Sequence, residues 1–167
     1  MNTKIDWFEI RRKIFHILLG LLLVILLYFD ILKLWMIAIF LIIGVIISLL
    51  YKSWDIPIIH WLLQTFERPD HIKTFPARGI LFIFFSTLIL MAFFEKNIVM
   101  ASLMIWTIGD SISALIGKHY GKFKHPFNDV RLVEGTIAGI IAATLASSIF
   151  IVFYKALIAS IIAMTLE

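Results

Sequence analysis

Residues 109–135 read GDSISALIGKHYGKFKHPFNDVRLVEG and lie between two long apolar stretches of the chain. The segment begins with an acid, Asp110, inside an apolar run, and it ends where Glu134 precedes the next apolar run. A carboxylate within a membrane-spanning helix is unfavourable, so its presence there indicates a functional site. Two Gly-Lys steps, at 117–118 and 121–122, can bring backbone N–H groups and ammonium groups close to an anion. We therefore expect this segment to bind phosphate at a membrane face.

The rest of the chain has the composition of an integral membrane protein. Of its 167 residues 62% are apolar, and the mean hydropathy is +1.01. A chain of this length is expected to form one domain, so residues 1–167 are predicted to be a single helical bundle in the membrane. Because cysteine is absent, disulfides and thiolate metal sites are excluded.

The apolar stretches predict about five transmembrane helices, judged against the roughly 20 residues that a helix needs to cross a bilayer. They cover about residues 14–29, 32–51, 79–94, 98–117 and 134–154. A shorter apolar segment, about 156–166, is predicted to be a partial helix or an unfinished span. Residues 1–13 mix apolar and charged side chains, which predicts a helix on the membrane surface that runs into the first span. Residues 58–66 predict a second interfacial helix, anchored by Trp61.

The distribution of Lys and Arg predicts the orientation of the bundle. If the N-terminus is cytosolic, then residues 1–13 and the two long connections, 52–78 and 118–133, carry 12 of the 15 Lys and Arg residues. The turns on the other side carry the remaining 3. Because cytosolic connections are enriched in Lys and Arg, this orientation is favoured. We therefore expect an all-α, polytopic bundle whose N-terminus and candidate site face the cytosol.

Asp110 permits two interpretations. On a helix, Thr107, Asp110, Ser113 or Ala114, and Gly117 recur at steps of three and four residues, so they share a small, polar face. The carboxylate can be a ligand of a hard divalent cation such as Mg²⁺, which bridges phosphates. It can also pair with a basic residue and hold two helices together. The position of the acid inside a predicted span favours the metal ligand.

Glu134 also permits two interpretations. A negative charge at a helix N-terminus is favoured by the helix dipole, and the same carboxylate can be a second metal ligand. The predicted helix then carries a row of small residues at four-residue spacing, namely Gly135, Gly139, Ala143 and Ser147. Such a row permits close packing against another helix. If the row packs on the face of Asp110, the two acids approach each other.

The basic residues can bind phosphate or can simply set the topology. On charge alone the connection 118–133 is best explained by the enrichment of positive charge on the cytosolic side. Glycine at 117 and at 121 favours the phosphate site, because glycine lets backbone N–H groups face an anion. At the start of the first span, Arg12, Lys13 and His16 can share a helix face. From spacing alone they are best explained as membrane-interface anchors with an incidental histidine.

Taken in order, these residues resemble a known family. The resemblance is carried by EIRRKIFH at 9–16, GD at 109–110, Ala114, GK at 117–118 and 121–122, and EGT at 134–136. Together they are similar to the CTP-dependent lipid kinases, which include dolichol kinase, phytol kinase and the CTP-dependent diacylglycerol kinase, and which are related to the phosphatidate cytidylyltransferases. The resemblance covers about residues 9–167 and depends on the ordered set, since no single motif is decisive.

The resemblance implies that the terminal phosphate of CTP is transferred to a lipid hydroxyl. It implies Asp110 as the central acid, and we expect Asp110, together with Glu134, to hold Mg²⁺. His16 or a carboxylate would take the hydroxyl proton. The residues expected at the nucleotide are Arg12, Lys13, Gly117, Lys118, Gly121, Lys122 and Arg131. Arg131 keeps a basic charge where the family often has Lys-Ser or Lys-Thr.

We therefore expect a kinase of a polyprenol-like, dolichol-like or diacylglycerol-type lipid, since phosphoryl transfer depends mainly on positioning and charge neutralisation. Its expected partners are this lipid, CTP and the bilayer, with a homo-oligomer as a further possibility and without nucleic acid. A lipid cytidylyltransferase is the alternative, although the paired glycines after His and the later Asp-Arg of that family are absent. A small proton-coupled or cation-coupled transporter is more distant, because the polar residues cluster at one face.

Overall fold

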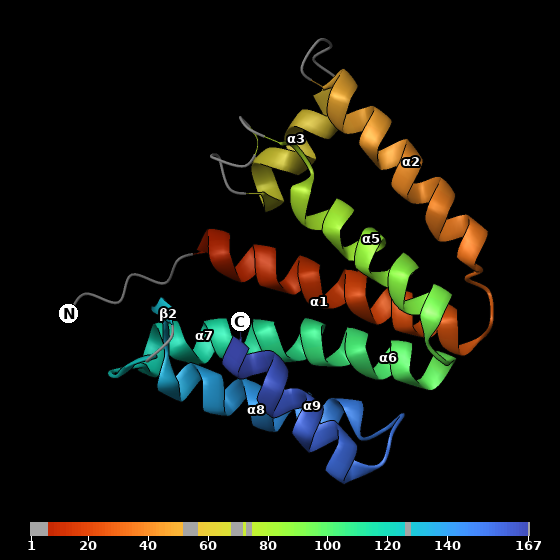
Figure 1. Cartoon of the computed structure of the whole chain (residues 1–167). Helices are drawn as coiled ribbons and strands as arrows, with labels where there is room; N and C mark the ends of the chain where they lie inside the picture. The colour runs from red at the N-terminus through yellow and green to blue at the C-terminus, as the bar shows by residue number, and fades with distance from the viewer. Residues whose placement is uncertain (1–6, 52–56, 68–71, 73–74, 126–127, 167) are drawn as a thin grey trace.

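The computed structural model describes residues 7–51, 57–67, 72, 75–125 and 128–166, and the chain is almost entirely helical (Figure 1). The helices are α1 (Trp7–Tyr28), α2 (Leu34–Leu50), α3 (Pro57–Phe66), α5 (Arg78–Phe93), α6 (Lys96–Met104), the π-helical η1 (Ile105–Gly109), α7 (Asp110–Tyr120), α8 (Val133–Ser147) and α9 (Phe153–Leu166). A short antiparallel hairpin of β1 (Lys124–His125) and β2 (Asn128–Leu132) joins α7 to α8. The predicted all-α class is thus confirmed, with a hairpin in the connection 118–133 that the sequence pattern does not reveal.

Four of the predicted apolar stretches are helices in the structure: α1, α2, α5, and the continuous helix of α6, η1 and α7. The amphipathic N-terminal segment does run into the first stretch without a break, because α1 already begins at Trp7; residues 1–6 lie outside the described residues. The predicted helix at 58–66 is α3, and Trp61 on it is exposed. Long apolar runs therefore locate these helices correctly.

The fifth predicted span, 134–154, is wrong in its length, because α8 ends at Ser147 and α9 begins at Phe153. The hydroxyl of Ser147 donates to the carbonyl of Ala143 at 2.7 Å, and the hydroxyl of Ser148 donates to Leu145 at 2.8 Å. Such bonds compete with regular helix geometry. The chain then turns back over five residues that contain no glycine or proline, so the sequence carries no signal for this break.

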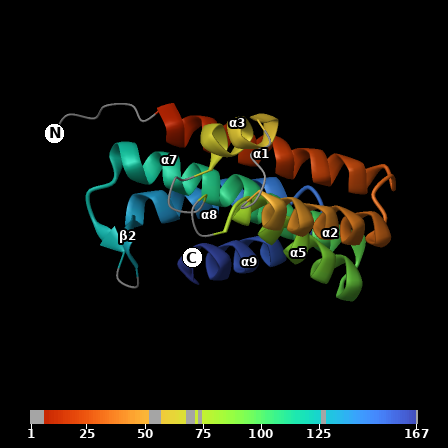
Figure 2. The same cartoon turned by 90° about the horizontal axis from the view of Figure 1, so that it is seen from above.

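The helices pack in pairs that lie side by side (Figure 1). The helices α2 and α5 form one pair, α1 packs against α6, and α8 lies between α7 and α9. Buried side chains of α1, among them Leu23 and Leu27, meet Val99 and Met100 of α6. Figure 2 shows α3 lying over the first part of α1, which it contacts. This packing places the N-terminal turns of α1 beside α7.

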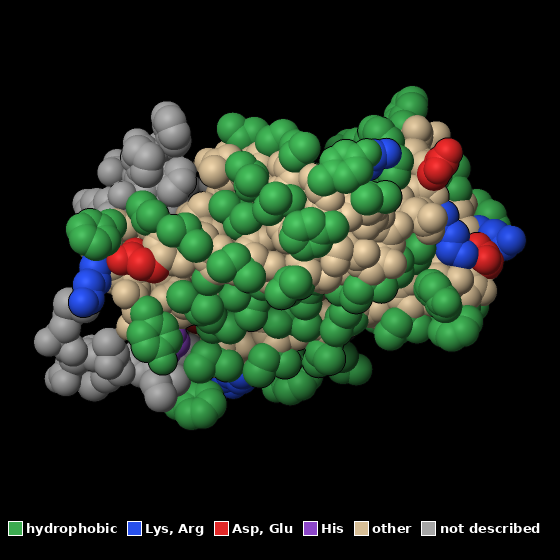
Figure 3. Space-filling model, turned by 90° about the horizontal axis from the view of Figure 1, so that it is seen from below, with side chains coloured by type: hydrophobic (Ala, Val, Ile, Leu, Met, Phe, Trp, Pro, Cys, Tyr) green, Lys and Arg blue, Asp and Glu red, His purple; other side chains and the backbone are tan. Residues whose placement is uncertain are grey.

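Apolar side chains cover much of the outside of the molecule. Of the 17 residues of α2 only Ile37 and Ser48 are buried, although none of the 17 is charged. Figure 3 shows hydrophobic side chains across the middle of one face, with most of the charged ones toward the two ends. Among the described residues, one helix, Lys96–Tyr120, is long and apolar enough by itself to cross a membrane. The apolar helices α2, α5, α8 and α9 are shorter, with 14 to 17 residues, so the number of spans stays a prediction.

Candidate functional site

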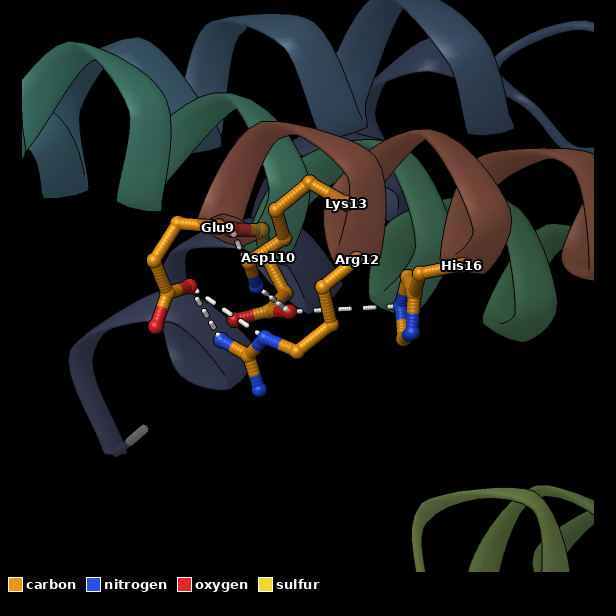
Figure 4. A network of polar contacts seen from close by, with 5 residues as sticks. All are labelled: Glu9, Arg12, Lys13, His16 and Asp110. Carbon is orange, nitrogen blue, oxygen red and sulfur yellow. Dashed lines mark hydrogen bonds and ion pairs between the residues drawn. The ribbon is translucent and has the colours of Figure 1, made fainter. Parts of the chain in front are cut away.

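The centre of the candidate site is an ion pair between α1 and α7 (Figure 4). The ammonium of Lys13 donates to Oδ2 of Asp110 and, at 3.4 Å, to the backbone carbonyl of the same residue. Lys13 is only 5% exposed and Asp110 9%. Nε2 of His16 lies 3.9 Å from the same carboxylate oxygen. Three residues that the sequence suggests separately are therefore brought to one place.

A close approach of α1 to the facing helix positions this pair. Gly20 of α1 lies against Thr107 of η1, and a Cβ atom at Gly20 would overlap the threonine side chain. Lys13 is two helical turns before Gly20 on the buried face of α1, and Asp110 follows Thr107 by three residues. The two helices run in opposite directions (Figure 1), so Lys13 and Asp110 lie on the same side of the contact between Gly20 and Thr107, where the long Lys13 side chain reaches the carboxylate.

The π-helical segment η1 ends directly at Asp110. A π-helical turn contains more residues than an α-helical turn, so it rotates the residues that follow, and it often occurs at functional sites. Trp106 within η1 packs on the ring of His16, with the ring centroids 3.8 Å apart. The prediction that Asp110, Ser113 and Gly117 share one polar face of the helix is wrong. Asp110 faces α1, whereas Ser113 and Gly117 contact α8.

Several buried polar atoms around Asp110 have no hydrogen-bond partner among the described residues. They are Nε2 of His16, Oγ1 of Thr107 and Oγ of Ser111. Most buried polar atoms in proteins are hydrogen-bonded, and exceptions are found where water, an ion or a reacting group completes a site. Their concentration next to a buried ion pair marks this region as a candidate site, independently of any sequence motif.

Arg12 makes a second ion pair at the edge of the site. Its Nη2 and Nε donate to Oε2 of Glu9, one turn earlier on α1, at 2.7 and 3.2 Å. Figure 4 shows this pair beside the Lys13–Asp110 pair. Glu9 is the first residue of the motif EIRRKIFH, and its spacing of three residues from Arg12 is one at which a helix brings charges together. Arg12 and Lys13, the two cations of α1 that are predicted at the nucleotide, therefore each contact a carboxylate.

The structure does not bring Glu134 to Asp110. The carboxylate of Glu134 accepts hydrogen bonds from the backbone N–H groups of Lys122, at 2.9 Å, and Phe123, at 3.3 Å. Its neighbour Gly135 contacts Gly117, which is seven residues, or about 10 Å along a helix, from Asp110. Glu134 lies in the first turn of α8 and closes the turn at 121–123, so its position matches the dipole interpretation and not the shared metal site.

The two Gly-Lys steps also differ from the prediction. Gly117 and Lys118 belong to the last turn of α7, where backbone N–H groups are bonded within the helix. The N–H of Gly121 donates to the carbonyl of Gly117 at 2.9 Å, and the next two N–H groups bind Glu134. The backbone of this segment is therefore already used. The side chains of Lys118 and Lys122 are exposed, and the side chain of Arg131 lies outside the described residues.

The glycines have a packing role instead. The predicted small-residue row of Gly135, Gly139, Ala143 and Ser147 is buried. A Cβ atom at Gly139 would lie 2.8 Å from the Cβ of Ser113 and 3.0 Å from the carbonyl oxygen of Gly109. The row thus lets α8 approach the helix that carries Asp110, as a row of small residues is expected to do.

The residues around Asp110 fit Mg²⁺ as a site with one protein carboxylate, and not as a site made entirely of protein ligands. Among the described residues, no group of three or more His, Cys, Asp or Glu side chains could enclose a metal ion. Mg²⁺ is commonly held by one or two carboxylates together with substrate phosphates and water. A single carboxylate at Asp110 is compatible with that pattern, whereas Glu134 is bound elsewhere.

Comparison with known proteins assigns no family. No family model, no curated protein and no solved structure matches the chain. What the site does is therefore inferred from its residues and their geometry.

Proposed function

We propose that this chain is a membrane enzyme that transfers the terminal phosphate of CTP to the hydroxyl of a lipid alcohol of the polyprenol or diacylglycerol type. The observation that carries the proposal is the buried Lys13–Asp110 pair with the unpartnered Nε2 of His16 beside it. Buried charges with a specific partner are typical of functional sites. The ordered resemblance of these residues to the CTP-dependent lipid kinases supplies the reaction.

The exposed apolar surface supports a membrane setting. A helix that is apolar on all sides is normally buried or surrounded by lipid, and α2 is apolar on all sides but has only two buried residues. Its 17 residues extend over about 26 Å, close to the roughly 30 Å of a bilayer core. We propose that α1, α2, α5, the continuous helix Lys96–Tyr120 and α8 cross the membrane, with the N-terminus and the candidate site on the cytosolic side.

Cysteine labelling tests this topology. The chain contains no cysteine, so a single introduced cysteine reports one position without background. Phe123 precedes the hairpin and Val152 lies between α8 and α9, and both side chains are exposed. In sealed vesicles of known orientation, we expect a membrane-impermeant maleimide to label Phe123→Cys from the cytosolic side only and Val152→Cys from the other side only. Labelling of both positions from the same side would contradict the proposed crossing of α8.

The residues of the site have separate tasks in this proposal. Asp110 would hold Mg²⁺, which when bound supplies positive charge at the phosphates. Arg12, Lys118 and Lys122 would neutralise the remaining phosphate charge. The half-buried pair of Arg12 with Glu9 is formed within one helix, and such pairs contribute about 0.2–0.5 kcal/mol, so Arg12 can exchange Glu9 for a phosphate. Lys13 would keep Asp110 oriented, because a buried pair is much harder to separate.

His16 would receive the proton of the lipid hydroxyl. A general base must lie within hydrogen-bond reach of that proton, and Nε2 of His16 is buried without a partner next to Asp110. The lipid oxygen bonds to the γ-phosphorus of CTP as the bond from that phosphorus to the β–γ bridging oxygen breaks. The products are the lipid phosphate and CDP.

Labelled CTP tests the proposed function. The full chain, reconstituted in lipid, is incubated with Mg²⁺, a panel of lipid alcohols and CTP labelled in either the γ- or the α-phosphate. We expect γ-label in the lipid product and CDP in solution. Transfer of the α-label with release of pyrophosphate would identify a cytidylyltransferase instead, and absence of both labels from every lipid would contradict both assignments.

A further inference from the structure

A cavity of about 380 Å³ lies between α1, α3 and α5. Its volume is within the range of about 300–1,000 Å³ that is usual for small-molecule sites. The wall contributed by α1 consists of Arg12, Phe15, His16 and Leu19, whose spacing of three and four residues defines one helix face. This face differs from the one that carries Lys13 and Gly20 toward η1 and α7. The cavity thus lies on a neighbouring face of α1, beside the face that carries the ion pair.

His16 lies at the border between the two sides of α1. Its ring lines the cavity and also packs on Trp106, with Nε2 3.9 Å from the carboxylate of Asp110. A molecule bound in the cavity at His16 is therefore next to the candidate site.

The cavity has a charged end and an apolar interior. On α1 the charged residue Arg12 comes first and Leu19 lies two turns later, and on α5 Arg78 comes first and Ile83 lies more than one turn later. The rest of the apolar lining is Leu62, Leu63, Phe66, Ile80 and Phe82. A ligand that fits this lining has a polar head and a hydrocarbon chain.

Glu67 provides an unsatisfied acceptor in the same cavity. Its Oε2 accepts a hydrogen bond from the backbone N–H of Ala77 at 2.6 Å, which holds the turn before α5. Its Oε1 is buried and has no hydrogen-bond partner within the part of the chain that the structure describes. Nε2 of His16 is the second buried atom without a partner among the residues that line the cavity. Two unsatisfied atoms in one cavity indicate a ligand that brings a hydrogen-bond donor, such as a hydroxyl group.

We propose that this cavity binds the hydroxyl end of the acceptor lipid, with Glu67 as a residue that positions it and His16 at the reacting oxygen. The hydrocarbon chain follows the apolar lining and continues into the bilayer, because the cavity is large enough for the head end of a long lipid only. The lipid thus approaches Asp110 along the cavity face of α1, and Arg12, which the proposed function assigns to the phosphates, lies at the charged end of that cavity. This inference rests on the proposed kinase function, and it names the acceptor half of that site.

Binding is tested first without CTP, so that the result does not depend on activity. The probe is a long-chain fatty alcohol with a diazirine near its hydroxyl, photolysed with the full chain in lipid nanodiscs. We expect cross-links on the cavity-lining residues of α1, α3 and α5, and competition by the unmodified alcohol. Cross-links confined to lipid-facing residues outside the cavity, such as those of α2, would overturn the inference.

Two matched substitutions then test the cavity in the reaction. Leu19→Trp fills the cavity, whereas Val45→Trp places the same side chain in a second groove of about 210 Å³ between α2 and α5, which shares only Phe82 with the cavity lining. We expect Leu19→Trp to raise the KM for the lipid about tenfold, which corresponds to about 1.4 kcal/mol, and to leave the KM for CTP unchanged. Val45→Trp should change neither constant. Equal lipid KM values for the two variants would overturn the inference.

Glu67→Gln keeps the proposal testable if a tryptophan impairs folding. The amide oxygen of Gln can still accept the N–H of Ala77, while a donor replaces the unsatisfied acceptor Oε1. We expect a several-fold rise in the lipid KM, a fall in cross-linking yield and an unchanged melting temperature. An unchanged lipid KM and cross-linking yield would remove Glu67 from the site.

The outcomes separate this inference from the proposed function. Specific cross-linking in the cavity without CTP turnover would support a lipid-alcohol site and contradict the kinase. CTP-dependent phosphorylation with cross-links elsewhere, and with a lipid KM that does not respond to Leu19→Trp, would support the kinase and overturn the acceptor site.

Discussion

Asp110→Asn is expected to lower phosphate transfer from CTP by at least about a hundredfold, the size of effect seen when one electrostatic group is removed from an active site. Asn keeps the shape of the side chain but lacks the anionic oxygen that a hard cation requires. The substitution also leaves Lys13 buried without its counter-ion. Removing one partner of a buried pair costs about 3–5 kcal/mol, so a loss of stability is expected together with the loss of activity.

A double substitution separates the two effects. Replacing a buried ion pair by apolar residues of similar size is often neutral for stability, so Lys13→Met combined with Asp110→Leu should restore the melting temperature. It should not restore transfer from CTP. If the pair only joins α1 to α7, the double variant will instead recover both stability and activity, and the assignment of Asp110 to the reaction is then wrong.

The exposed ion pair between Lys96 and Asp30 serves as the control. Lys96 contacts Asp30 at 2.7 Å, and the Asp30 side chain is 76% exposed. Exposed pairs contribute little to stability, so Asp30→Asn should leave the melting temperature and the rate of transfer close to those of the unsubstituted chain. The comparison is made on purified protein in one detergent, with thermal unfolding and γ-label transfer measured on the same samples.

Gly135→Ala is expected to lower the stability of the protein by more than an added methyl group usually does. In a well-packed core, an added methyl group typically costs about 1–3 kcal/mol of stability. A Cβ atom at Gly135 would overlap the carbonyl oxygen of Ser113 and would lie 2.8 Å from Cα of Gly117. These neighbours are backbone atoms of α7, so they cannot move aside as a flexible side chain can. The added methyl group must instead separate α8 from the helix that carries Asp110.

Gly→Ala substitutions at two other positions are expected to give smaller losses of stability, so the three variants can be ranked. A Cβ atom at Gly117 would be 3.5 Å from Cα of Gly135, an ordinary contact, and one at Gly79 would have no neighbour within 4 Å. The expected order of melting temperatures is therefore Gly79→Ala highest, Gly117→Ala intermediate and Gly135→Ala lowest. Gly79→Ala can even stabilise the chain, because Ala is favoured over Gly in a helix by up to about 1 kcal/mol. Equal melting temperatures for Gly79→Ala and Gly135→Ala would show that α7 and α8 do not pack this closely.

Most of the helices are predictable from the sequence because they depend on local properties. A run of apolar residues of sufficient length forms a helix wherever it lies in the chain, so α1, α2, α5 and the long helix Lys96–Tyr120 coincide with the predicted stretches. The break after Ser147 was missed, since it depends on side-chain hydroxyls that bind backbone carbonyls and not on glycine or proline. The hairpin between α7 and α8 was missed as well.

The role of each glycine could not be read from its identity. Gly117 and Gly121 are compatible both with a phosphate-binding backbone and with close packing, because the absence of a side chain serves either purpose. The position of α8 brings Gly135 against Gly117, and this contact shows that the glycine serves close packing. In the same way, the hydrogen bonds of Glu134 to Lys122 and Phe123 decide between its two interpretations.

The sequence by itself determined the helical class and the position of most helices. It suggested Asp110 by its position in an apolar run, whereas Arg12, Lys13 and His16 were suggested by the family resemblance and not by their spacing. Tertiary structure alone decided which of them meet. Lys13 and Asp110 are 97 residues apart, and their contact depends on the close approach of Gly20 to Thr107 and on the rotation introduced by η1. Neither that approach nor the cavity beyond His16 is a property of one segment, because both arise where separate helices pack together.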